Sequence, residues 1–173
     1  MTTGNPELAT LFLEISRKEL IAKYWPQLRE CVSSLTEEQV WYRPNDASNS
    51  IGNLLMHLNG NVGQWIVGSF SHNDDKRDRP REFSTREGLT AQELLAQLGS
   101  TLLKAEAVLA QLTAEDLAAT YVIQGKSASG MEAIYHSISH FILHYGQIVY
   151  AVKAMQNRDL GFYRELNKTG RYA

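Results

Sequence analysis

The amino-acid sequence predicts an all-α protein, a four-helix bundle with a long loop between the second and third helices. Two observations support this prediction: apolar residues recur with helical period in four long segments, and most of these segments begin with a recognisable capping residue. Only one short stretch is β-prone, and 173 residues are enough to enclose one core. We therefore expect a single domain over residues 1–173.

The first helix should begin behind Asn5 and run to about Ser33. Asn5 is a favourable N-cap residue, and Pro6 and Glu7 suit the first helical turn. Because Pro26 cannot donate a backbone hydrogen bond, we expect it to kink this helix or divide it in two. A short helical turn, "TEEQVWY", follows behind a capping box of its own.

The second helix should begin behind Ser50, where "SIGNLLMHLNGNVGQWIVGSF" has apolar residues at helical spacing. Residues 71–88, "SHNDDKRDRPREFSTREG", carry many charges of both signs and no helical apolar stripe. We interpret them as a surface loop. Loops of this length usually serve a function, such as covering a site.

The third helix should begin behind the capping box at Thr90, over "TAQELLAQLGSTLLKAEAVLAQL". A further short helical turn, the β-prone stretch "TYVIQG" and a turn over residues 125–129 come next. Ser129 and Glu132 form the capping box of the last long helix, which we expect at about residues 130–156.

The composition excludes several classes of function. A formal net charge of -2 leaves no basic excess for binding nucleic acid or an anionic membrane surface. The N-terminus does not resemble a signal peptide. The longest uncharged run, residues 133–152, contains three histidines, two serines and a glutamine, which favours a buried helix over a membrane span. Cys31 is the only cysteine and is expected in the core, which fits a cytoplasmic protein without disulfides.

Three histidines lie four residues apart in the last helix: His136, His140 and His144. Each step of four residues turns the direction by only ~40°, so the three side chains share one stripe. Because residues 133–152 carry no charge, we expect this helix to be the most enclosed one, and its imidazoles then need buried partners. The alternative is that such a spacing arose by chance, with no ligand role.

The second helix has a matching uncharged polar stripe of Asn53, His57, Asn61 and Gln64. If the two stripes face each other, His57 meets two imidazoles of the last helix. Three nitrogen ligands from two helices are what a divalent metal needs while it keeps open positions for water or substrate. The alternative is that this stripe is the wet face of the second helix.

The segments "SIGNLLMHLNGNVGQW" and "HFILHYGQIVYAVK" together resemble the DinB-like superfamily of four-helix-bundle metalloenzymes, and "DRPREF" is similar to a subgroup of unknown function. The resemblance implies a divalent ion (Zn, Ni, Fe or Mn) held by His57, His140 and His144. It gives His136 no ligand role, so we expect this residue in the pocket. Many relatives carry an arginine where this chain has Tyr145. The other expected pocket residues are Asn53, Asn61, Gln64 and Gln147.

The first functional hypothesis is a metal-dependent enzyme acting on a small molecule. A metal with open coordination activates water or stabilises a thiolate, which suits a hydrolase or a thiol transferase. His136 and Tyr145 are the candidates for moving protons. Residues of the charged loop could also reach the site, with carboxylates for proton transfer and arginines for an anionic substrate. They are Asp74, Asp75, Asp78 and Glu82, and Arg77, Arg79 and Arg81.

The second hypothesis is a non-catalytic module in which the metal, if bound, is structural. The uncharged last helix carries apolar residues around its whole circumference, more than one intramolecular face requires. A homodimer that packs such helices together would bury the excess. A homodimer is compatible with the enzyme hypothesis as well.

Overall fold

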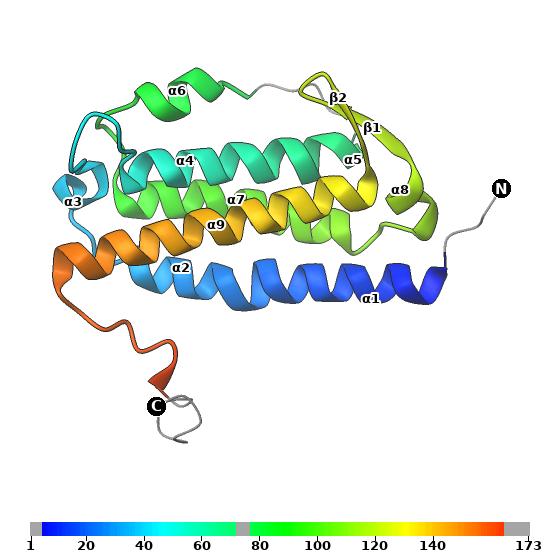
Figure 1. The fold of residues 1–173 in the computed structure, drawn as a ribbon, viewed down its shortest axis with the longest axis horizontal. Coiled ribbons are helices and arrows are strands. Elements are labelled where there is room, and N and C mark those ends of the chain that lie inside the picture. Colours follow the sequence, from blue (N-terminus) through cyan, green and yellow to red (C-terminus); the bar gives the residue numbers. More distant parts are fainter. Residues whose placement is uncertain (1–4, 72–76, 165–173) are drawn as a thin grey trace.

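The computed structural model describes residues 5–71 and 77–164 of the chain. Four long helices lie side by side and make up most of the molecule (Figure 1), which confirms the predicted bundle. The first long helix comprises α1 (Pro6–Arg17), the π-helical segment η1 (Lys18–Tyr24) and α2 (Trp25–Val32). The second comprises α4 (Ile51–Val62), the π-helical segment η2 (Gly63–Gly68) and α5 (Ser69–Ser71). The third is α7 (Ala91–Leu109), and the last is α9 (Gly130–Gln156).

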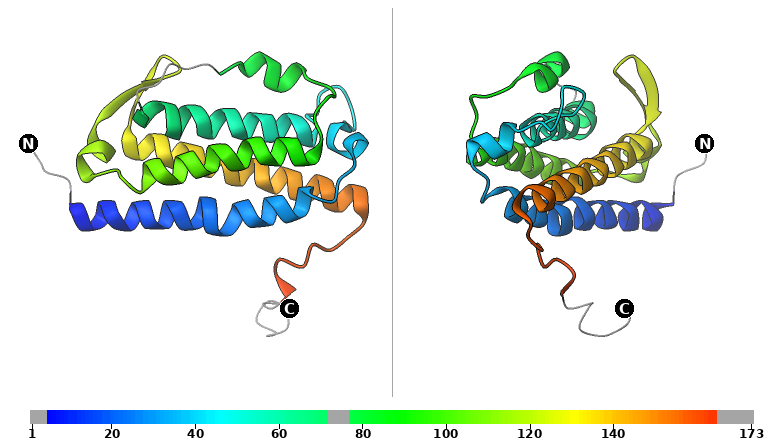
Figure 2. Two further views of the ribbon diagram at one scale, coloured as in Figure 1. Left: turned by 180° about the vertical axis from the view of Figure 1, so that it is seen from behind. Right: turned by 60° about the vertical axis from the view of Figure 1, so that its left-hand side comes forward.

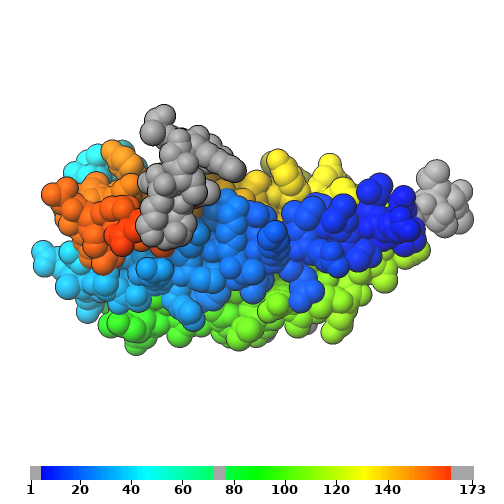
Figure 3. All heavy atoms as spheres, turned by 90° about the horizontal axis from the view of Figure 1, so that it is seen from below, coloured from blue at the N-terminus to red at the C-terminus, as the bar shows by residue number. Residues whose placement is uncertain are grey.

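One hydrophobic core lies between the four long helices. The second long helix packs against both α7 and α9, and the first long helix closes the core from the other side. Figure 3 shows this first helix lying between α9 and α7 when the molecule is seen from below. The largest fully buried side chains come from all four helices and include Leu20, Leu28, Leu55, Leu58, Leu98, Leu102, Phe141 and Ile148.

A wider helical turn lies directly before Pro26 in the first helix. The seven residues of η1 form π-type hydrogen bonds immediately before α2, in which Pro26 occupies the first turn. Pro26 has no N–H to donate to the preceding turn, yet the helix continues to Val32. Cys31 lies in this part of the core and is fully buried, as expected.

The expected surface loop over residues 71–88 needs correction. Its described part contains a short helix, α6 (Arg79–Ser84), which lies above α4 in Figure 1 and packs against it. Asp78 caps this helix by accepting a hydrogen bond from the backbone N–H of Arg81, and Pro80 stands in its first turn. Six residues are too few for a helical apolar stripe, so the pattern alone did not indicate a helix.

A small hairpin closes one end of the bundle beside the short helix α8 (Ala114–Ala118), and α3 (Glu37–Trp41) lies at the opposite end (Figures 1 and 2). Strands β1 (Thr120–Ile123) and β2 (Lys126–Ser129) pair antiparallel, with Thr120 opposite Ser129. The turn is only Gln124 and Gly125, both with positive φ, whereas we expected it over residues 125–129.

The last helix has the predicted bounds and the predicted Ser129 capping box. The prediction that it would be the most enclosed helix is wrong, because α4 has nine buried residues among twelve and α9 has eight among 27. One uncharged face is open to solvent, and its side chains Tyr135, Leu143 and Tyr150 are 67%, 58% and 77% exposed. Within the described residues, no helix is both long enough and apolar enough to cross a membrane.

Candidate metal centre

The polar stripes of the second and last helices face each other. Asn53, His57 and Asn61 are buried, so the stripe on α4 is not a wet face. The hydroxyl of Ser137 on α9 donates to Oδ1 of Asn61 at 3.1 Å and joins the two helices directly. The lack of charge on both stripes follows from this burial, since an unpaired charge between two packed helices would be costly.

Three of the histidines meet where the stripes are in contact. His57, His140 and His144 each offer one nitrogen, and these atoms lie within 4.8 Å of one another. The Nε2 atoms of His57 and His140 are 2.7 Å apart. Nδ1 of His144 donates to Gln147 Oε1 at 2.7 Å, because a carbonyl oxygen only accepts, and Nε2 therefore keeps its lone pair.

The donor set fits a small divalent ion. Tetrahedral coordination at ~2.0–2.1 Å places two nitrogen ligands about 3.3 Å apart, so the His57 and His140 rings would have to separate by about 0.6 Å. Burial, reinforced by the charges of neighbouring histidines, lowers the pKa of His140 to about 4, and burial also lowers the pKa of His144. Neutral imidazole is the form that binds metals.

A carboxylate from the charged segment reaches the outward nitrogen of His57. Glu82 in α6 places Oε2 2.7 Å from His57 Nδ1, and the two side chains are only 7% and 5% exposed. Of the acidic residues that could have reached in, the structure therefore brings Glu82 to the cluster. Asp78 caps α6, and Asp74 and Asp75 lie outside the described residues.

Arg77 holds this carboxylate in place. Its Nε lies 2.6 Å from Oε1 of Glu82 and its Nη2 lies 2.8 Å from Oε2, a two-pronged ion pair. Burial alone would raise the pKa of Glu82, but the hydrogen bonds from Arg77 and His57 outweigh it and lower the pKa. Arg77 is thus committed to an internal carboxylate, which argues against its expected contact with an anionic substrate. Arg79 and Arg81 are exposed.

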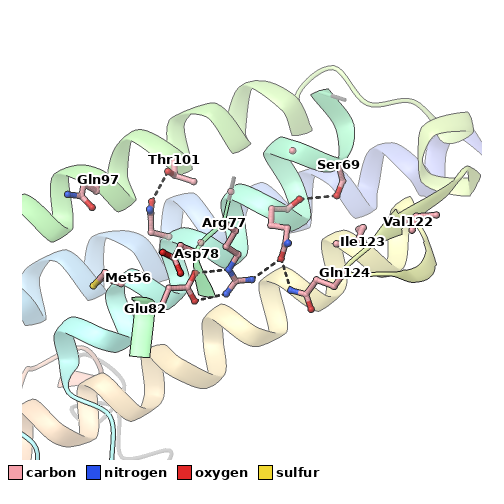
Figure 4. Close-up of a pocket in the computed structure, with 15 residues that line it drawn as sticks. Met56, Ser69, Arg77, Asp78, Glu82, Gln97, Thr101, Val122, Ile123 and Gln124 are labelled. Atoms are coloured by element: carbon pink, nitrogen blue, oxygen red, sulfur yellow. Dashed lines mark hydrogen bonds and ion pairs between the residues drawn. The ribbon is translucent and has the colours of Figure 1, made fainter. Parts of the chain in front are cut away.

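Gln64 connects this ion pair to the hairpin. Its Oε1 accepts hydrogen bonds from Arg77 Nη1 at 2.9 Å and from Gln124 Nε2 at 2.6 Å. Figure 4 shows Arg77 and Glu82 on the wall of a pocket of about 420 Å³ that α4, α7 and the hairpin also line, with Thr101 and Gln124 among its polar groups. The polar residues of the second helix therefore contact the segment of Arg77 and Glu82 as well as the last helix.

The remaining candidates lie at the edge of the cluster or outside it. The His136 ring packs on Trp65 at a tilt of 34°, with centroids 4.0 Å apart, and lies nearly parallel to the His140 ring at 5.5 Å. His136 therefore lies beside a candidate ligand. Tyr145 is buried, and its hydroxyl donates to Oε1 of Gln27 on α2 at 2.6 Å, so it is engaged by the first long helix.

The fold of this protein is that of DinB-like helical bundles. A DinB-like protein from Bacillus cereus ATCC 10987 matches with a TM-score of 0.63 at 13% identity, over 78% of this chain and 87% of that chain. A DinB-like protein from Bacillus subtilis gives 0.62 at 21% identity, over 81% and 91%. A conserved protein from Enterococcus faecalis gives 0.62 at 16%, over 88% and 97%.

Within this class, the chain belongs to the family described as "Protein of unknown function (DUF1572)", whose model matches residues 7–164. No curated protein matches the chain in sequence. At the identities of the solved structures the likeness establishes the fold, and the reaction has to be argued from the site itself.

Proposed function

We propose that this protein binds one divalent metal ion through His57, His140 and His144, and that it is a metal-dependent enzyme of the hydrolase or thiol transferase type. The observation that carries the proposal is the convergence of three buried or half-buried imidazole nitrogens from two helices. Imidazole suits several divalent ions, zinc, nickel and iron among them, and the donor set does not select one.

Three protein ligands leave coordination positions open, as in catalytic metal sites. A divalent ion bound there supplies a Lewis acid that activates water or stabilises a thiolate. His140 and His144 are only half-buried, which gives a small substrate access to the cluster. His136 lies against His140 and is the nearest candidate for moving a proton in this chain.

The second candidate function is a dimeric bundle in which the metal is structural. It is supported by the uncharged face of α9, where Tyr135, Leu143 and Tyr150 are largely exposed. A second copy of the chain would cover these side chains, although a dimeric enzyme would use the same face. A single domain over residues 1–173 and a cytoplasmic location are part of the same proposal.

Metal analysis of protein purified without a histidine tag tests the assignment. We expect about one equivalent of Zn, Ni, Fe or Mn per chain, and a loss of this metal in His57→Ala, His140→Ala and His144→Ala. His136→Ala is the matched control and should retain the metal. A wild-type protein that takes up no stoichiometric metal, or a ligand variant that binds as well as wild type, contradicts the proposal.

The cobalt-substituted protein separates the enzyme from the structural module. An open position should accept added imidazole or a small thiol, with a change in the visible absorption of Co²⁺. A spectrum that neither addition alters indicates closed coordination and favours the structural module.

A further inference from the structure

We propose that Glu82, held by Arg77, is a positioning residue that presents Nε2 of His57 to the metal. This inference rests on the proposed function, because it concerns residues that contact a ligand of the same site. The geometry that carries it is the short contact of an ionised, buried carboxylate with the nitrogen of His57 that faces away from the other histidines.

The contact determines where the proton of His57 resides. An ionised carboxylate only accepts hydrogen bonds, so the 2.7 Å contact with Glu82 places the proton on Nδ1 of His57. Nη2 of Arg77 also lies 3.0 Å from this nitrogen, but it has the closer Oε2 of Glu82, at 2.8 Å, to donate to. A neutral imidazole has one ring proton, and Nε2 then keeps the lone pair that a metal requires. Histidine ligands in metalloproteins commonly donate their second N–H to such a carboxylate, which also fixes the plane of the ring.

Several contacts fix the carboxylate itself. Arg77 grips both oxygens of Glu82, and its side chain is only 6% exposed. Asn53 Nδ2 donates to the backbone carbonyls of Glu82 and Thr85 at 2.9 and 2.8 Å, which fastens α6 to α4. The Phe83 ring packs on the His57 ring with centroids 4.7 Å apart. A buried ion pair adds little net stability by itself. Stability therefore does not explain this pair, whereas the positioning of His57 does.

Gly60, one turn after His57 on α4, makes this approach possible. A Cβ atom at Gly60 would collide with Oε1 of Glu82 and would lie 2.7 Å from Nε of Arg77. A side chain there must displace the carboxylate or its arginine. Gly63, one turn further, would place its Cβ 3.7 Å from the nearest atom, Cγ2 of Thr101, an ordinary contact.

The two glycines offer a matched pair of variants that leave every candidate ligand in place. Gly60→Ala should dislodge Glu82, whereas Gly63→Ala should not, and alanine favours helix at both positions. Glu82→Gln keeps the size of the side chain and removes its charge. We would measure Zn²⁺ affinity by competition with a chelator, and the tautomer of His57 in the metal-free protein by ¹⁵N NMR.

We expect Zn²⁺ affinity to fall about 10- to 100-fold in Gly60→Ala and Glu82→Gln, the range typical of such partners, and to stay within about twofold in Gly63→Ala. His57 should be protonated on Nδ1 in the wild type and in Gly63→Ala, and should become a mixture of tautomers in Glu82→Gln. If Gly60→Ala fails to fold, the Zn²⁺ affinity and the His57 tautomer of Glu82→Gln together test the positioning role.

If the wild type binds zinc and both Gly60→Ala and Glu82→Gln bind it equally well, the positioning role is refuted and the three-histidine assignment stands. An unchanged His57 tautomer in Glu82→Gln refutes it in the same way. If the wild type binds no metal, the proposed function fails first, and this inference falls with it.

Discussion

The Nε2 atoms of His57 and His140 lie 2.7 Å apart, although the two residues are 83 positions apart in the chain and lie on different helices. In the metal-free protein, one ring can donate its proton to the other. A divalent ion would replace this single hydrogen bond with bonds to both nitrogens.

Metal binding should therefore stabilise the folded protein. At a free zinc concentration of 100 times Kd, binding to the native state alone adds about 2.7 kcal/mol to the free energy of unfolding. For a chain of this length we expect Tm to rise by about 5–10 °C. Differential scanning calorimetry with and without zinc measures this shift. The shift should disappear in His140→Ala, and a His140→Ala protein stabilised as much as the wild type would speak against the assigned ligand.

Removing one partner of the buried ion pair should be more harmful than removing both. Arg77→Met leaves the Glu82 carboxylate buried without its main counter-charge, and we expect a loss of about 3–5 kcal/mol in the free energy of unfolding. The double variant Arg77→Met with Glu82→Leu should recover a large part of it. Urea denaturation of the three proteins provides the comparison, and additive losses would show that the two side chains act independently.

The metal-free protein should lose stability in mild acid. The folded-state pKa of His140 is lowered to about 4 from 6.5, so between these values the unfolded chain binds more protons and is favoured as the pH falls. The lowered pKa of Glu82 acts in the same direction below its ordinary value of 4.5.

For His140 the loss should stay below about 3 kcal/mol, because its ring is only half-buried. Urea denaturation at a series of pH values from 7 to 4 measures it. His140→Ala should show a flatter profile than wild type over this range, and an equally steep profile would assign the effect to other groups.

Tyr145 should matter for stability and not for the metal. Tyr145→Phe removes the hydroxyl that donates to Gln27, and we expect a loss of about 1 kcal/mol in the free energy of unfolding. Zinc affinity should be unchanged, as measured by the same chelator competition. A large fall in affinity, or in any activity later found, with stability intact would restore Tyr145 as a candidate for the chemistry.

The long helices could be predicted because their signals are local. The expected capping boxes at Thr36, Thr90 and Ser129 are formed, and Ser50, the expected start of the second helix, caps it as well. Apolar periodicity over three or more turns identified the helices between them. The π-helical segments were not predicted, because the apolar period continues through them and does not distinguish a π-type turn from an α-helical one.

The site was only partly predictable, because tertiary contacts bring Glu82 and Arg77 to the histidines. Spacing placed His140 and His144 on one stripe, but nothing local distinguishes Glu82 from the other acidic residues of its segment. Its role depends on α6 packing against α4 at a glycine, which is a tertiary contact. Tyr145 follows His144 directly, and one helical step of ~100° turns its side chain toward the first long helix.

The separation of His57 and His140 in the chain has a consequence for how the protein could be unfolded. An ion held by both would act as a reversible cross-link across 83 positions, in a chain whose single cysteine cannot form an internal one. A disulfide that closes a loop of about this length restricts the unfolded chain by roughly 4–5 kcal/mol. A chelator would then destabilise this bundle by removing the cross-link between its second and last helices, as a reducing agent destabilises a secreted domain by breaking its disulfides.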